Sequence, residues 1–231
     1  MPRAGLLLLP LLLCFGPETA GSIDTAVLKD IVDHVHPSWV TAQYSFAVSL
    51  NTTYCQNTTG LEQELPVRQL RSMRNAIRQN SQEGGLYDPA DGNIVAASVN
   101  YLNEKAREHT EWRLLHSDQN QKSPVQKLLD RTYKNNSCLI FFTLNSPCVR
   151  TCLPMNKPFN ILNMVKNTFH PIDNNFKAFV FQQIYQETMK PEMRLQAWQQ
   201  LNDVPLYRCD KDGCRDCSGN NPNTNPCLDR R

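Results

Sequence analysis

The apolar and polar positions along the chain predict strands that alternate with helices. Segment 44–50 places Tyr44, Phe46, Val48 and Leu50 on one face, which is the period-two pattern of a strand. Segment 138–144 is almost continuously apolar, which is typical of a strand covered on both faces in an α/β sheet. Three further strands are expected at 93–101, 176–185 and 204–207.

Helical patterns fill most of the segments between these strands. A capping sequence at 22–25 begins the first helix. Pro191 begins the last one, in which Leu195, Trp198 and Leu201 recur at three-residue spacing. The other helices are expected at 67–77, 103–116 and 125–133, with one more beginning at Cys148. The stretch 61–92 is otherwise polar, so we expect an insertion or a long connection there.

The N-terminus has the three parts of a secretory signal peptide. Arg3 precedes the short apolar run 6–15, and small residues follow it. The run is too short to span a bilayer, and no later segment is long and apolar enough to do so. We therefore expect a signal peptide from Met1 to Gly21 and a secreted, extracellular product with no membrane span.

Three Asn-x-Ser/Thr triplets agree with that compartment. They begin at Asn51, Asn57 and Asn135. N-glycosylation takes place only on chains that enter the secretory route, so these asparagines are candidate glycosylation sites.

The charge pattern gives little support for a polyanion-binding surface. The formal net charge is only +2. Arg68, Arg71 and Arg74 recur at three-residue intervals, and we interpret them as a solvated helix face in preference to a nucleic-acid surface.

The cysteines restrict the possible bridges. The chain has nine, and removal of Cys14 with the leader leaves eight. If Cys148 and Cys152 are metal ligands, six remain, which suits three disulfides in an oxidising compartment; eight cysteines also suit four bridges. In the tail, disulfides are favoured over a zinc knuckle after secretion. The disulfide candidates are Cys55, Cys138, Cys209, Cys214, Cys217 and Cys227.

One constellation carries chemistry: a His-Thr-Glu triplet at 109–111 and a later Ser-Pro-Cys-Val-Arg-Thr-Cys segment at 146–152. His-x-Glu with Pro-Cys and a second cysteine is the signature of the zinc deaminases, although the cysteine spacing here is three residues instead of two. Taken separately, a chance His-x-Glu and two disulfide halves are the simpler interpretations. Together, one imidazole and two thiols provide the three ligands of a hydrolytic zinc site with an open position for water.

The spacing assigns different roles to the four side chains. On a helix, Cys148 and Cys152 would be four residues apart and point the same way, with Pro147 in the first turn. Residues two apart diverge by about 200° on a regular helix, so His109 and Glu111 must lie at a helix start. His109 is then a metal ligand, and Glu111, near the metal but not bound to it, transfers protons during hydrolysis.

The residues just quoted resemble the AID/APOBEC-like branch of the cytidine deaminase superfamily, and the leader makes the chain most similar to its secreted members. The resemblance implies a three-layer α/β fold with a five-stranded mixed sheet flanked by helices. It also implies Zn²⁺ on His109, Cys148 and Cys152, with Glu111 as the proton shuttle. Asn145 stands where members that act on polynucleotides often carry a tryptophan.

These observations lead to one hypothesis and its rivals. We expect a signal peptide at 1–21, a deaminase-like domain at 22–207 and a disulfide-rich tail at 208–231. The domain would convert cytosine to uracil in a nucleoside or single-stranded polynucleotide, and family analogy suggests host defence. One rival within this chemistry prefers a free nucleoside or adenine. A rival from another class is a catalytically inactive, secreted binding or structural protein.

Overall fold

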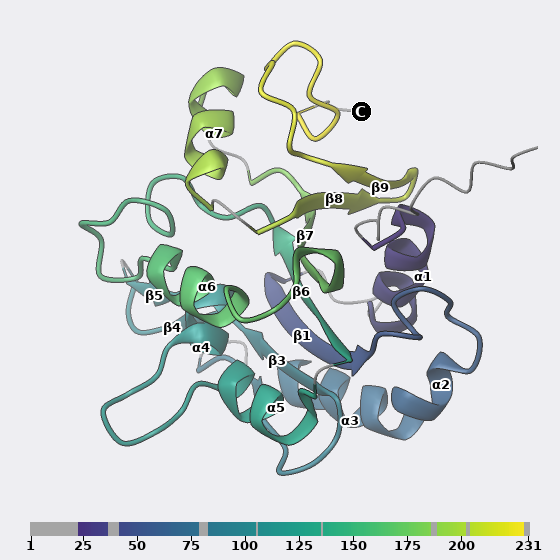
Figure 1. The fold of residues 1–231 in the computed structure, drawn as a ribbon. Coiled ribbons are helices and arrows are strands. Elements are labelled where there is room, and N and C mark those ends of the chain that lie inside the picture. Colours follow the sequence, from purple (N-terminus) through teal and green to yellow (C-terminus); the bar gives the residue numbers. More distant parts are fainter. Residues whose placement is uncertain are drawn as a thin grey trace, which may run out of the picture.

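The computed structural model describes residues 23–36, 42–78, 83–104, 106–134, 136–185, 189–201 and 204–228. The expected signal peptide and Asn135 lie outside these residues. A seven-stranded mixed sheet forms the centre of the molecule, in the order β2-β3-β1-β6-β7-β8-β9 (Figure 1). Its strands are β1 (Tyr44–Asn51), β2 (Leu86–Tyr87), β3 (Ile94–Ser98), β6 (Ser137–Asn145), β7 (Lys177–Gln183), β8 (Leu206–Asp210) and β9 (Gly213–Asp216).

Helices cover both faces of this sheet, as expected. On one face the core includes α1 (Thr25–Val35), α2 (Leu61–Glu64) and α3 (Val67–Arg78). On the other it includes α4 (Thr110–Leu115), α5 (Pro124–Thr132), α6 (Leu162–Phe169) and α7 (Pro191–Trp198). Two short 3₁₀ helices, η1 (Asn174–Phe176) and η2 (Gln199–Leu201), precede β7 and follow α7. The three-layer α/β prediction is confirmed.

Strand β6 shows why the apolar run was continuous. It pairs antiparallel with β1 and parallel with β7, so it lies inside the sheet. Leu139 and Phe141 pack in one core cluster, whereas Ile140 and Phe142 pack in the other. A strand covered on both faces needs apolar residues at nearly every position, so its sequence does not alternate between apolar and polar residues.

The expected number of five strands is wrong, because two edge strands have no apolar pattern. Strand β2 lies within the stretch 61–92 that was expected to be an insertion or a long connection. It has two residues and pairs with β3, which follows that stretch. Helix α3, in the same stretch, buries Leu70, Met73 and Ile77 in the core, so the stretch is part of the fold. At the other edge, the polar strand β9 adds to β8.

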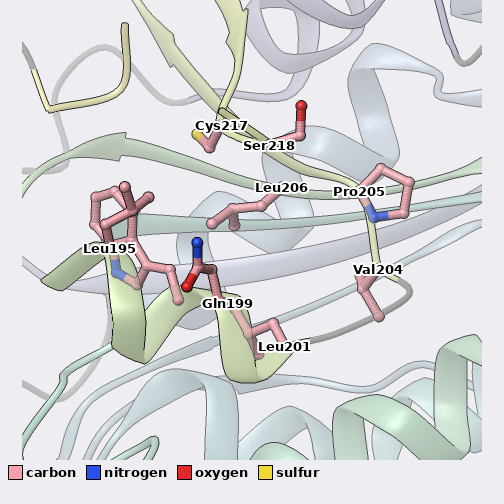
Figure 2. Close-up of a pocket in the computed structure, with 9 residues that line it drawn as sticks. Leu195, Gln199, Leu201, Val204, Pro205, Leu206, Cys217 and Ser218 are labelled. Carbon is pink, nitrogen blue, oxygen red and sulfur yellow. The ribbon is translucent and has the colours of Figure 1, made fainter. Parts of the chain in front are cut away.

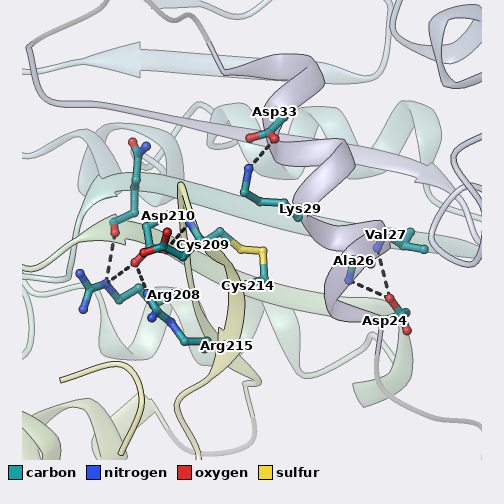
Figure 3. Close-up of a disulfide and its surroundings, with 12 residues drawn as sticks. Asp24, Ala26, Val27, Lys29, Asp33, Arg208, Cys209, Asp210, Cys214 and Arg215 are labelled. Carbon is teal, nitrogen blue, oxygen red and sulfur yellow. Dashed lines mark hydrogen bonds and ion pairs between the residues drawn. A yellow bond between two sulfur atoms is a disulfide. The ribbon is translucent and has the colours of Figure 1, made fainter. Parts of the chain in front are cut away.

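The sheet therefore extends into the tail, where two disulfides form among the predicted candidates. Cys209 and Cys214 face each other across the β8–β9 hairpin and form a disulfide (Figure 3). Beyond the hairpin, Cys217 is bridged to Cys227, and the guanidinium of buried Arg208 donates to the Cys227 carbonyl oxygen at 3.1 Å. Bridges and hydrogen bonds replace apolar periodicity here.

The third disulfide joins Cys55 to Cys138 and links the loop after β1 to the start of β6. All six cysteines that were candidates for disulfides are thus bridged. No helix within the described parts of the chain is long and apolar enough to cross a membrane.

The disulfides differ in the length of chain they close, and this predicts their contributions to stability. Cys55 and Cys138 are 83 residues apart, whereas Cys209 and Cys214 are 5 apart. Loop entropy gives about 4.5 kcal/mol for the first bridge and about 2 kcal/mol for the second. Denaturant unfolding should therefore show a larger decrease in the free energy of unfolding for C55S/C138S than for C209S/C214S. Equal losses would contradict the entropic explanation.

A histidine at the end of α1 predicts acid sensitivity. The ring of His36 hydrogen-bonds the hydroxyl of buried Tyr44 and stacks on its ring. Burial lowers the pKa of His36, opposed by Asp33 and reinforced by Lys29 and Arg74. The fold thus favours the neutral ring, whereas the unfolded chain takes up a proton near pH 6.5.

Stability from His36 is therefore complete above pH 6.5 and is lost as the pH falls toward the lower pKa of the folded state. Relative to wild type, H36Q should lose less unfolding free energy between pH 7.5 and pH 5, as measured by denaturant titration. H170Q is the control, because His170 is exposed at the end of α6. A steeper pH dependence in H36Q than in wild type would contradict this assignment.

Candidate functional site

The His-x-Glu pair lies at the beginning of α4, not inside the predicted helix 103–116. Strands β4 (Asn100–Tyr101) and β5 (Arg107–Glu108) form a small hairpin, and α4 begins only at Thr110. His109 is the N-cap, with extended backbone angles of φ −69° and ψ 150°. Because the chain direction changes at His109, its ring and the Glu111 carboxylate can approach each other despite their two-residue spacing.

The thiols follow β6 on a single turn instead of beginning a helix. The Cys152 amide donates to the Cys148 carbonyl oxygen at 2.9 Å, and the next helix begins only at Leu162. Pro154 explains the early end, because it has no amide hydrogen and disfavours helical angles in the residue before it. One turn is enough to place the two thiols on the same side.

The four side chains come together as the sequence predicts. Nδ1 of His109 lies 3.2 Å from the sulfur of Cys152. Ligand atoms of His109, Glu111 and Cys152 all lie within 4.8 Å of one another. Cys148 hydrogen-bonds the Cys152 thiol and lines the same cavity as His109 and Glu111. Among the cysteines described, only Cys148 and Cys152 have free thiols.

These donors fit a zinc ion. Nitrogen and sulfur ligands at about 2.0 and 2.3 Å from one tetrahedral zinc ion lie roughly 3.5 Å apart, close to the His109–Cys152 separation. The hydrogen bond with Cys148, burial and the charge of Glu111 raise the pKa of the Cys152 thiol well above its usual range. A cation at this point would favour the thiolate, which is the form that binds metal.

Glu111 is held in a fixed orientation under the cavity. Only 2% of the residue is exposed. The hydroxyl of Thr143 donates to Oε1 at 2.9 Å, and the hydroxyl of Thr110 donates to Oε2 at 3.1 Å. Each carboxylate oxygen therefore has its own donor, which compensates for part of the cost of burying the group.

A cavity of about 70 Å³ opens over these residues. Several of its lining residues carry no local sequence motif and were not predicted. Tyr185 follows β7, whose parallel pairing places Gln183 beside Asn145, so a parallel register is the signal that would have found it. The guanidinium of Arg107 donates to the Tyr185 hydroxyl at 2.9 Å. The lining is completed by Gln43, Val99, Tyr101, His109, Glu111, Asn145, Ser146 and Cys148.

A larger cavity of about 240 Å³ lies between α7, β8 and the tail (Figure 2). It shares no lining residue with the cavity beside His109. Its walls contain apolar side chains, Gln199, Ser218 and the bridged Cys217, but no carboxylate, imidazole or free thiol. This larger cavity therefore offers no group for acid–base chemistry or metal binding, whereas the cavity beside His109 offers an imidazole, a carboxylate and a thiol.

The described glycosylation candidates and the arginine row lie apart from the cavity, whereas Asn145 belongs to its lining. Asn51 and Asn57 are exposed, and Asn51 ends β1 beside the start of β6 at Ser137. Asn145, at the other end of β6, lines the cavity. Arg74 donates to the His34 and Val35 carbonyl oxygens at the end of α1, which interrupts the row that it forms with the exposed Arg68 and Arg71.

Comparison with known proteins agrees with this geometry. No curated protein and no solved structure matches the chain. The model of a family described as Secreted Novel AID/APOBEC-like Deaminase 1 matches residues 25–231, which include the whole sheet and all four side chains of the site. The chain therefore belongs to the Secreted Novel AID/APOBEC-like Deaminase 1 family.

Proposed function

We propose that this protein is a secreted zinc-dependent deaminase that converts cytosine to uracil in a nucleoside or a single-stranded polynucleotide. The observation that carries the proposal is a cavity lined by His109, Glu111 and Cys148, with the sulfur of Cys152 3.2 Å from Nδ1 of His109. Family membership supports the same chemistry.

His109, Cys148 and Cys152 are the proposed zinc ligands. Three protein ligands leave one position open, which a hydrolytic site requires. Glu111 is close enough to be a ligand. Both of its oxygens accept hydrogen bonds from threonine hydroxyls, however, and this favours a carboxylate that remains beside the ion. When bound, Zn²⁺ would supply Lewis-acid activation of water.

Glu111 is the proposed proton shuttle. Hydrolytic deamination adds water to C4 of cytosine and releases ammonia, so the water must give one proton to the ring nitrogen N3 and its second proton to the leaving amine. A buried carboxylate with a fixed orientation can accept each proton in turn and pass it on. The products, uracil and ammonia, account for all the atoms of cytosine and water.

The cavity walls suit a nucleobase. Tyr101 and Tyr185 supply aromatic rings, on which a base taken out of its stack can lie. Asn145 adds an amide group of the kind that binds the polar edge of a base. These residues support an aromatic substrate with a polar edge, and Asn145 holds the position of the tryptophan that stands before Ser-Pro-Cys in many members that act on polynucleotides.

Secretion and glycosylation complete the proposal. Three disulfides are typical of proteins in oxidising compartments, and the family description also says secreted. Asn51 and Asn57 are exposed, and each side-chain oxygen accepts hydrogen bonds from the backbone amide and hydroxyl of the threonine two residues later. We propose removal of residues 1–21 and glycans on Asn51, Asn57 and Asn135.

Replacing Glu111 and Cys148 separately distinguishes the proposed roles. E111Q should keep about one zinc per chain but lose at least about 100-fold in kcat, since general acid–base catalysis contributes that much or more. C148S should lose zinc. Metal analysis and ammonia release from cytidine, deoxycytidine, single-stranded DNA and single-stranded RNA measure both effects, with adenosine as the competing base.

The reverse metal result, zinc lost in E111Q and retained in C148S, would make Glu111 a ligand and exclude its proposed role. Zinc-loaded wild type that is as inert as E111Q on every substrate would favour the rival, a binding protein with a structural metal.

The maturation proposal is tested on protein secreted from animal cells. Intact-mass and N-terminal sequencing should place the new N-terminus at Ser22. Treatment with peptide N-glycosidase should lower the mass, and N51Q, N57Q and N135Q should each remove one glycan. An intact Met1–Gly21 segment, or a mass that the glycosidase does not change, would contradict it.

A further inference from the structure

We propose that Gln43, Thr143 and Thr110 are positioning residues that hold the Glu111 carboxylate in the orientation needed for proton transfer. The inference rests on the proposed deaminase function. It goes beyond that function because the sequence motif contains only Thr110, and Gln43 and Thr143 lie on or beside two different strands. Gln43 immediately precedes β1, and Thr143 lies within β6.

The polar groups beneath Glu111 form a local exception in an apolar core. Thr143 and Ser45 are fully buried and lie opposite each other on β6 and β1. Thr110 is also fully buried, and its hydroxyl oxygen lies 2.5 Å from that of Ser45. Buried hydroxyls cost free energy unless they are hydrogen-bonded, and here they gather where a buried carboxylate needs donors.

The number of protons determines the direction of these hydrogen bonds. An ionised carboxylate only accepts, and each hydroxyl has one proton to give. Thr143 and Thr110 therefore use their protons on Glu111 and can only accept from other groups. It follows that Ser45 donates to Thr110, and that the amide nitrogen of Gln43 donates to Thr143 at 3.0 Å.

The orientation of the Gln43 amide is fixed independently. The backbone N–H of Asn145 donates to Oε1 of Gln43 at 3.1 Å. A backbone N–H cannot accept, so oxygen must face Asn145 and nitrogen must face the threonines. Nε2 also lies 3.4 Å from the Thr110 hydroxyl. The chain of donors thus runs from the Asn145 backbone through Gln43 and Thr143 to Glu111.

The test compares T143V, which removes the hydroxyl at nearly constant shape, with T143S, which retains it. In zinc-loaded protein, T143V should lose about 10- to 100-fold in kcat with KM and zinc content unchanged, and T143S should recover most of the loss. T132V is the matched control, because the Thr132 hydroxyl donates to the Leu128 carbonyl oxygen in α5, away from the network.

Gln43 also lines the cavity, so a double variant separates positioning from substrate contact. Q43M should lower kcat in the wild-type background but add little to the loss in T143V, because Gln43 acts through Thr143. Losses that add, or a Q43M effect confined to KM, would assign Gln43 to substrate binding and overturn its positioning role.

A spectroscopic measurement keeps this inference separate from the proposed function. The ¹³C signal of the Glu111 carboxyl carbon, assigned with E111Q, should shift in T143V and return in T143S even if wild type turns over no substrate. If wild type is inactive but the Glu111 signal shifts in T143V and returns in T143S, the proposed function is contradicted and the positioning role is retained. An unmoved signal, a T143S variant as impaired as T143V, or an equal loss in T132V would overturn the positioning role.

Discussion

The pairing of β6 with β1 on one side and β7 on the other is the constraint on which the rest of the structure depends. At one end of β6, Cys138 is bridged to the loop after β1. In the middle, alternate side chains fill the two cores. At the other end, Thr143 reaches Glu111, and the chain turns into the segment that carries Cys148. A shift of one residue in this register would exchange the two faces and move Thr143 away from Glu111.

Sequence patterns predicted the elements whose stability comes from burying apolar faces. Strand β6 and helix α3 are examples, because their apolar residues pack directly in the cores. Strand β9 was not predicted, since its pairing is stabilised by a disulfide and its side chains are polar. The helix expected from 103 was shortened to α4, because Arg107 and Glu108 form β5, which pairs with β4 and carries no strand pattern in the sequence.

The same contrast holds for the candidate site. His109, Glu111, Cys148 and Cys152 were found because their spacing is set by the chemistry they would share. In the structure His109, Glu111 and Cys148 line one cavity, and Cys152 lies against His109. Gln43, Tyr101 and Tyr185 come from segments far apart in sequence and meet only through the sheet and the β4–β5 hairpin. Predicting that such residues meet requires the register of the strands. Apolar patterns do not determine that register for the short strands of the β4–β5 hairpin.

The buried carboxylate explains why this end of the core is polar. Burying an ionised group costs several kcal/mol unless opposite charge and hydrogen-bond donors compensate. Two hydroxyls supply donors to Glu111. A zinc ion at His109 and Cys152 would offset two of the three negative charges of Glu111 and the two thiolates. The proposed metal would therefore have an electrostatic role in the fold as well as a chemical one.

The free thiols fit the same argument. The other described cysteines are all bridged, which is typical of chains that fold in an oxidising compartment. Cys148 and Cys152 are in contact with each other, yet they have no disulfide partner. Both are buried, at 8% and 0% exposure, which limits attack by soluble disulfides. Metal ligation would protect the two thiols further against oxidation, because their sulfur lone pairs would then be bound to the ion. The proposed zinc donor set thus explains why these two are the unbridged members among the cysteines that the structure describes.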